Sequence, residues 1–69
     1  MGDIGAKLRE LRGDRTIREV SEAVGVTEAA MSYYETGKRT PRPQIMIRIA
    51  NYYGLPVGAI FFNEQLTRG

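Results

Sequence analysis

The stretch that decides the fold runs from Thr16 to Pro41 and reads TIREVSEAVGVTEAAMSYYETGKRTP. It contains two segments with apolar residues at helical spacing, separated by Gly25. Thr16 and Glu19 have the spacing of a capping box, which marks a helix start, and Thr27 stands where the second segment needs its N-cap. Glycine at position 25 allows the left-handed backbone of a tight turn. The stretch therefore predicts two short helices joined by a tight turn.

The apolar residues of these two predicted helices form one shared seam. Its members are Val20, Val24, Val26, Met31 and Tyr34. Ser21 is small at the point where two crossing helices approach each other most closely. This is the layout of a helix-turn-helix, whose second helix lies in the major groove of DNA. A helix suits that groove because the groove is roughly 12 Å wide.

Three further segments outside this stretch complete an all-α domain. Apolar spacing predicts helices over Asp3–Arg12, from Pro43 onward and over Val57–Phe62. No segment predicts a strand. The sequence thus predicts a compact five-helix bundle in which the second and third helices form the helix-turn-helix.

The composition excludes most enzymatic chemistry. The chain has 69 residues with no Cys and no His, so disulfides, the usual zinc sites and Ser-His or Cys-His catalysis are excluded. We expect no enzymatic activity, no cofactor, no metal and no small-molecule ligand. No membrane-spanning run or signal peptide is present, so we expect a cytoplasmic location and no membrane partner. The length fits a single domain over residues 1–69, with an ordered core at about 3–62 and a polar C-terminal tail at 63–69.

Positive charge is concentrated in the second half of the chain. The formal net charge is only +2. Residues 1–35 hold five Lys or Arg and seven Asp or Glu, whereas residues 36–69 hold five Lys or Arg and one Glu. The densest basic run is Lys38-Arg39-Thr40-Pro41-Arg42. Because this run directly follows the second helix of the motif, it favours a nucleic-acid contact over a merely solvated loop.

The segment from residue 16 to residue 41 resembles the Xre-type helix-turn-helix family, the DNA-binding domains of phage Cro and repressor proteins and their bacterial relatives. The most specific pieces of the resemblance are Gly25-Val26-Thr27 and Glu35-Thr36-Gly37-Lys38-Arg39-Thr40-Pro41. The likeness extends over about Ile4–Phe62. It implies a fold of the phage-repressor-like type and a sequence-specific transcriptional regulator, a repressor that binds an operator through its third helix. It also implies that Glu35 pairs with an Arg of the first helix, for which Arg12 is the candidate.

Helix geometry predicts which residues touch the bases of DNA. The residues expected to face the core are Ala30, Met31 and Tyr34. The outward face, where the resemblance also implies base contacts, then holds Glu28, Ala29, Ser32 and Tyr33. Glu28 can accept from cytosine or simply favour the helix dipole, and Ala29 can pack against a thymine methyl group. Ser32 suits several base edges, and Tyr33 suits a base, a phosphate or half-buried packing. No Arg, Gln or Asn lies on this face, so DNA shape is expected to supply part of the specificity.

Phosphate contacts are expected at both ends of the motif. The candidates are Thr16, Arg18, Thr27, Lys38, Arg39 and Arg42. Thr16 and Arg18 stand at the N-terminus of the second predicted helix, whose free amides attract anions. The basic residues of the run at 38–42 stand where family members hold the DNA backbone or enter the minor groove. Ile17 departs from the family, which commonly has Gln near the DNA backbone at that position.

Phe61 and Phe62 are candidates for a dimer interface. Two adjacent aromatic residues on one short helix cannot both point inward, so one is expected to be partly exposed. An exposed aromatic can mark an interface, although the tail could instead cover it. A homodimer, at least on DNA, would read an inverted repeat with half-sites about one helical turn apart.

Two classes of function stay open at this point. One is the DNA-binding repressor, a description that fits phage or mobile-element regulators, antitoxins and restriction-modification controllers alike. The other is a protein-interaction module on the same fold, such as an antitoxin or adaptor, with DNA binding weak or secondary. The basic run at 38–42 discriminates between them, because a pure adaptor does not need it.

Overall fold

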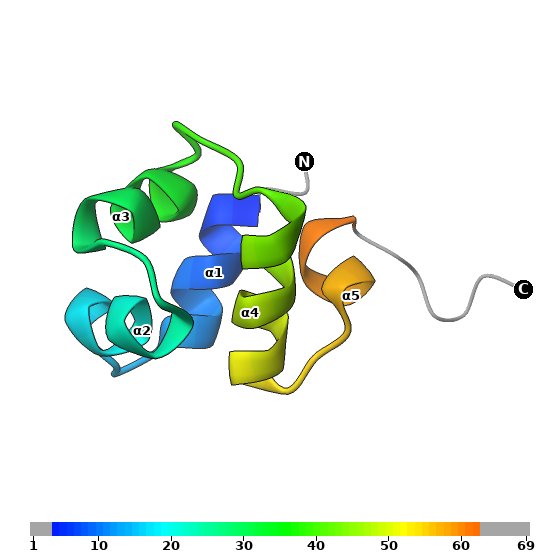
Figure 1. Cartoon of the computed structure of the whole chain (residues 1–69), viewed down its shortest axis with the longest axis horizontal. Coiled ribbons are helices and arrows are strands. Elements are labelled where there is room, and N and C mark those ends of the chain that lie inside the picture. Colours follow the sequence, from blue (N-terminus) through cyan, green and yellow to red (C-terminus); the bar gives the residue numbers. More distant parts are fainter. Residues whose placement is uncertain (1–3, 63–69) are drawn as a thin grey trace, which may run out of the picture.

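The computed structural model describes residues 4–62 and shows them as five helices with no strand (Figure 1). The helices are α1 (Ile4–Arg12), α2 (Ile17–Val24), α3 (Glu28–Thr36), α4 (Pro43–Tyr53) and α5 (Val57–Phe61). The predicted all-α bundle is therefore confirmed for this part of the chain. Asp3, the predicted first residue of the first helix, and the predicted polar tail at 63–69 lie outside the described residues.

Side chains at the helix starts determine where α2 and α3 begin. Thr16 Oγ1 accepts a hydrogen bond from the Glu19 amide at 3.0 Å, and the Glu19 carboxylate accepts one from the Thr16 amide at 3.0 Å. This reciprocal pair is the predicted capping box. Thr27 Oγ1 accepts from the Ala30 amide at 3.0 Å and is the N-cap of α3. Both starts of the helix-turn-helix are thus specified locally.

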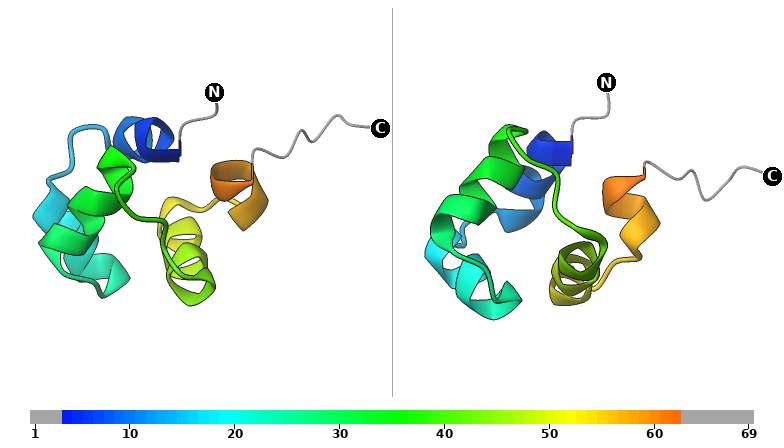
Figure 2. Two further views of the ribbon diagram at one scale, coloured as in Figure 1. Left: turned by 90° about the horizontal axis from the view of Figure 1, so that it is seen from above. Right: turned by 45° about the horizontal axis from the view of Figure 1, so that its top comes forward.

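The helix-turn-helix occupies one side of the molecule. α2 and α3 lie together there, α5 lies on the opposite side, and α1 and α4 lie between them (Figure 1, Figure 2). α1 packs against α3 and α5, while α4 packs against α2 and α5. The buried apolar residues are Leu8, Val20, Val24, Met31, Met46, Ile49, Ala50, Ile60 and Phe61. Since every helix contributes to this core, tertiary packing rather than helix propensity stabilises the short helices.

α1 and α3 meet at a joint made by Gly5, Arg9, Arg12 and Glu35. Glu35 is only 3% exposed, and Arg12 Nε donates to its two carboxylate oxygens at 2.9 and 3.1 Å. Arg9 donates a further hydrogen bond to the main-chain carbonyl of Glu35. A Cβ atom on Gly5 would lie 2.9 Å from the carbonyl carbon of Glu35. The α1–α3 joint therefore combines the implied Arg12–Glu35 ion pair with a backbone approach that requires glycine.

Replacing Gly5 with Ala tests this close approach. Ala is normally the better helix residue, by up to about 1 kcal/mol. At position 5, however, the added Cβ forces α1 away from α3, and overpacking of this kind costs about 1–3 kcal/mol. We expect Gly5→Ala to lower the free energy of unfolding, measured by urea denaturation. A variant more stable than the wild type would show that the two helices do not approach closely at this point.

Candidate nucleic-acid interface

The turn between α2 and α3 is closed by hydrogen bonds to one carbonyl. The Ser21 carbonyl accepts from the amides of Gly25 at 2.8 Å and Val26 at 3.0 Å. Gly25, the predicted turn residue, has a φ of +90°, a left-handed conformation that glycine adopts at little cost. Ser21 is buried, and its hydroxyl donates to the Arg18 carbonyl at 3.0 Å. A small side chain and a glycine thus let the two helices of the motif pack closely.

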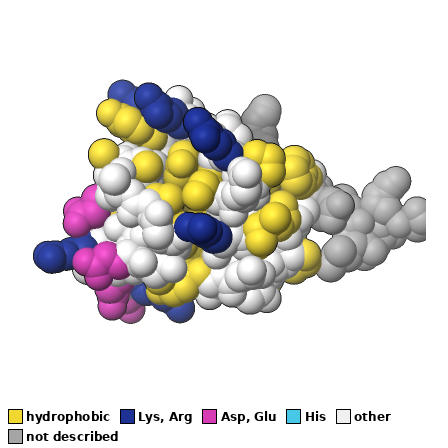
Figure 3. Space-filling view, viewed as in Figure 1, with side chains coloured by type: hydrophobic (Ala, Val, Ile, Leu, Met, Phe, Trp, Pro, Cys, Tyr) yellow, Lys and Arg dark blue, Asp and Glu magenta, His cyan; other side chains and the backbone are white. Residues whose placement is uncertain are grey.

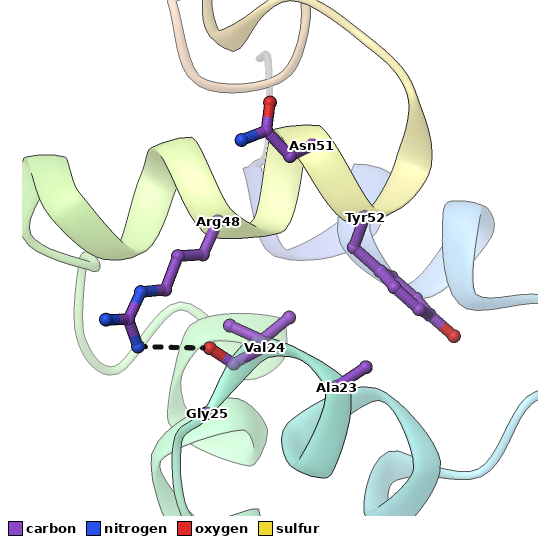
Figure 4. Close-up of a pocket in the computed structure, with 6 residues that line it drawn as sticks. All are labelled: Ala23, Val24, Gly25, Arg48, Asn51 and Tyr52. Atoms are coloured by element: carbon purple, nitrogen blue, oxygen red, sulfur yellow. Dashed lines mark hydrogen bonds between the residues drawn. The ribbon is translucent and has the colours of Figure 1, made fainter.

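The same turn is held from α4. Arg48 Nη1 donates to the Val24 carbonyl at 3.4 Å, at the C-terminus of α2 (Figure 4). A cation is favourable there because the helix dipole leaves partial negative charge at a C-terminus. A Cβ atom on Gly25 would lie 2.9 Å from this nitrogen. Sequence reasoning missed Arg48, because no local pattern links it to a carbonyl 24 residues away.

α3 presents an exposed face made of the residues predicted to contact bases. Glu28 and Ala29 are exposed, Tyr33 is 40% exposed, and Ser32 is half-buried. The residues predicted to face inward are buried or half-buried: Met31, Ala30 and Tyr34. The outward face contains one carboxylate and no cation. Any positive charge next to it must come from another segment.

The connection between α3 and α4 supplies that charge. Gly37 ends α3 at a φ of +82°, and the amides of Lys38 and Arg39 donate to the Tyr33 carbonyl at 2.9 and 3.3 Å. The chain therefore folds back over the last turn of α3. Lys38, Arg39 and Arg42 are all exposed. Lys and Arg side chains follow the upper edge of the molecule from α3 towards the start of α4 (Figure 3). The basic connection thus lies beside the exposed face of α3.

The N-terminus of α2 is electrostatically mixed. The hydroxyl of Thr16 accepts the Glu19 amide in the capping box, and Arg18 Nε lies 3.4 Å from the carboxylate of Glu22. Thr27, at the start of α3, likewise uses its hydroxyl as a cap. Acidic side chains gather on the side of the molecule around α2 (Figure 3). Thr16, Arg18 and Thr27, which are predicted to contact phosphates, therefore already contact other groups of the chain itself.

An arginine that sequence reasoning missed lies next to this terminus. The Arg15 guanidinium stands over two rings, 5.5 Å from the centroid of Tyr52 and 5.6 Å from that of Tyr53. The two rings meet edge to face with centroids 5.0 Å apart. Burial and then the negative charge of Glu35 raise the pKa of Tyr53 above its ordinary value. The aromatic partners come from the end of α4, so no local spacing indicates this contact.

The two adjacent phenylalanines separate into a core residue and a surface residue. Phe61 is 5% exposed and belongs to the apolar core, whereas Phe62 is 62% exposed. The predicted interface pair is therefore wrong for Phe61, because α5 turns that ring towards the core. α5 also ends at Phe61, one residue earlier than predicted, since Phe62 leaves the helical backbone at a φ of −120°. Of these two phenylalanines, only Phe62 has an exposed ring.

Residues 4–62 contain no group of three or more His, Cys, Asp or Glu that could hold a metal ion. Among these residues no helix combines the length and the apolar character that crossing a membrane requires. Their buried side-chain polar atoms all have hydrogen-bond partners.

The chain belongs to a family of helix-turn-helix domains, because it matches the model of that family over residues 3–59. It is similar to the cryptic phage CTXphi transcriptional repressor RstR of Vibrio cholerae, with 30% identity over 62 residues. The matched region is 87% of this chain and 56% of the relative, so the chain spans about half the length of that protein. No solved structure matches the chain. The resemblance to phage-repressor domains is confirmed, and the expectation of a non-enzymatic protein agrees with this family.

Gly25 and Gly37 offer a matched pair of substitutions. Their φ values are +90° and +82°, so Ala at either position costs about 1–2 kcal/mol of backbone strain. A Cβ at position 37 meets no atom within 4 Å, whereas one at position 25 displaces Arg48 from the Val24 carbonyl. We expect Gly25→Ala to lower the free energy of unfolding by about 1 kcal/mol more than Gly37→Ala, the value of one hydrogen bond. The measurement is urea denaturation of both variants.

The same comparison in an Arg48→Ala background is the control. There the difference between the two glycine substitutions should vanish, since the contact that causes it is already gone. A difference of unchanged size would exclude Arg48 as its cause.

Proposed function

We propose that this chain is a sequence-specific transcriptional repressor that places α3 in the major groove of an operator. The observation that carries the proposal is the exposed face of α3 with the exposed basic connection beside it. Membership of the helix-turn-helix family supports DNA binding, and the relative described above is named as a transcriptional repressor. The proposal includes the cytoplasmic location expected from the sequence, because a transcriptional repressor must reach the DNA that it regulates.

Base contacts in this proposal come from four residues of α3, which are Glu28, Ala29, Ser32 and Tyr33. Glu28 accepts from a cytosine amino group, and Ala29 packs against a thymine methyl group. Ser32 can donate or accept, so it tolerates more than one base. None of the four carries the two-pronged donor or donor–acceptor sets with which Arg, Asn and Gln read bases. DNA shape therefore contributes to the specificity of this face.

Backbone contacts come from six residues, which are Thr16, Arg18, Thr27, Lys38, Arg39 and Arg42. The three cations of the basic connection are the strongest of these, because no ion pair within residues 4–62 involves them. Beside Thr16, the amides in the first turn of α2 add an anion site. Arg18 must leave Glu22 to reach a phosphate, at small cost because exposed pairs are worth about 0–1 kcal/mol.

A homodimer on the operator is the second part of the proposal. Phe62 supports it, because a 62% exposed aromatic side chain suits an interface. A dimer with two-fold symmetry reads an inverted repeat, with half-sites about one helical turn apart.

Selection of bound duplexes from a random DNA pool at near-physiological salt tests both parts. Enrichment of an inverted repeat supports a dimeric reader, and its spacing gives the dimer geometry. Enrichment of a single half-site supports a monomeric reader and contradicts the dimer. If the folded protein enriches no sequence, DNA reading is contradicted, and the protein-interaction module with Phe62 on its surface becomes the better account.

Truncating the face of α3 should reduce discrimination between DNA sequences. We expect Ser32→Ala and Tyr33→Ala each to lower the ratio of operator affinity to random-DNA affinity, measured by fluorescence anisotropy. The corresponding loss in the binding free-energy difference between the two DNAs is about 1 kcal/mol or more. Lys7→Ala is the control, because the Lys7 side chain lies away from the face of α3. It points from α1 towards α5, where its Nζ donates to the Ala59 carbonyl at 3.1 Å. An unchanged ratio in both α3 variants would mean that another face reads the DNA.

Removing one cation from the basic connection should weaken binding to all sequences alike. For Lys38→Ala we expect the slope of log affinity against log salt concentration to become shallower by about 0.9, the value of one phosphate contact. Lys7→Ala removes the same charge away from α3 and should leave the slope unchanged. Equal slopes for Lys38→Ala and the wild type would place no phosphate beside residue 38.

A further inference from the structure

We infer that Arg39 is a specificity-determining residue that reads a guanine in the major groove, with the ring of Tyr33 supporting its guanidinium. The inference rests on the proposed function and goes beyond the backbone contact assigned there to Arg39. It adds the two-pronged donor that the outward face of α3 lacks. Three features of the structure carry it: the route of the chain after α3, the cation–π contact with Tyr33, and the absence of an ion pair to Arg39 within residues 4–62.

The backbone directs Arg39 back towards α3 rather than away from it. Gly37 turns the chain at a φ of +82°, and the Tyr33 carbonyl then accepts the amides of Lys38 and Arg39. The carbon of the Arg39 guanidinium consequently stands 5.4 Å from the centroid of the Tyr33 ring. Tyr33 itself belongs to the exposed face of α3. The guanidinium of Arg39 therefore lies beside the exposed face of α3, although the residue follows that helix in the sequence.

The contact leaves the hydrogen-bonding edge of Arg39 available. Cation–π attraction to the face of a ring does not use the N–H donors of a guanidinium, which lie in its own plane. Neither ion pair found within residues 4–62 includes Arg39. Arg12 and Arg48 differ in this respect, because Arg12 pairs with Glu35 and Arg48 donates to the Val24 carbonyl. Arg39 thus combines a held position with free donors.

Guanine is the base that such a group recognises. In the major groove guanine presents two neighbouring acceptors, O6 and N7, and arginine donates to both at once. The cation–π contact with Tyr33 already restricts the side chain, so less conformational freedom is lost when those bonds form. Lysine carries the same charge but lacks the planar pair of donors. Replacing Arg39 with Lys therefore distinguishes a base contact from simple attraction to phosphate.

The decisive variant is Arg39→Lys, tested on the operator that the wild type enriches and on copies with each guanine replaced in turn. We expect the wild type to prefer guanine over another base at one position by about 5- to 150-fold. Arg39→Lys should lose that preference while its affinity for random DNA and its salt slope stay near those of the wild type. Lys7→Ala should keep the preference. Retention of the guanine preference by Arg39→Lys would overturn the inference.

Modified bases locate the contact in one groove. At the position that Arg39 reads, 7-deazaguanine removes the N7 acceptor of the major groove, and inosine removes the amino group of the minor groove. We expect 7-deazaguanine to weaken binding by the wild type but not by Arg39→Lys. Sensitivity to inosine alone would place Arg39 in the minor groove and contradict the inference.

The role of the ring is tested by Tyr33→Leu. This variant is expected to lower the same guanine preference, and Arg39→Lys should add little further loss in that background. Additive losses would show that the two side chains act independently. A wild type that enriches no sequence contradicts the proposed function itself, whereas an enriched operator without an Arg39-dependent guanine contradicts this inference alone.

Discussion

A buried carboxylate at the end of α3 is the constraint on which the position of that helix depends. Glu35 is 3% exposed and stands at the negative end of the helix dipole, so both its desolvation and its location are unfavourable without a cation. Arg12, with its Nε 2.9 Å from a carboxylate oxygen, compensates that charge, and Arg9 donates to the main-chain carbonyl of Glu35 itself. Because the approach at Gly5 leaves no space for a side chain, α1 and α3 can cross in only a narrow range of geometries.

The opposite end of α3 is held through the turn that precedes it. Arg48 reaches from α4 to the last carbonyl of α2, and Gly25 provides the left-handed step that directs the chain into α3. α3 is thus fixed at both ends by contacts with other helices, which is the support that a precise binding surface requires. Cations such as Arg12 and Arg48 maintain this scaffold, whereas neither ion pair within residues 4–62 involves those of the basic connection.

Local patterns predicted the helices well, because caps and apolar spacing act over a few residues. Thr16 and Thr27 begin α2 and α3 as their neighbours in sequence indicate. Contacts made through tertiary structure were missed or misassigned. The pair Phe61-Phe62 predicts that one ring is exposed but not which one, since two adjacent aromatics do not reveal how a short helix is rotated against the core. The contact of Arg39 with the Tyr33 ring depends on how the chain reverses after α3, so a helical projection of α3 could not include it.

The distribution of charge limits how this domain can bind DNA. Acidic side chains gather around α2, and basic ones follow the connection after α3 (Figure 3). A phosphate backbone is therefore attracted to one end of the helix-turn-helix more strongly than to the other. Because the formal net charge is only +2, attraction to the polyanion depends on where the cations lie, and each phosphate that they neutralise contributes separately. In the proposed complex the basic connection would therefore supply most of this attraction, while the face of α3 and the shape of the DNA would supply discrimination between sequences.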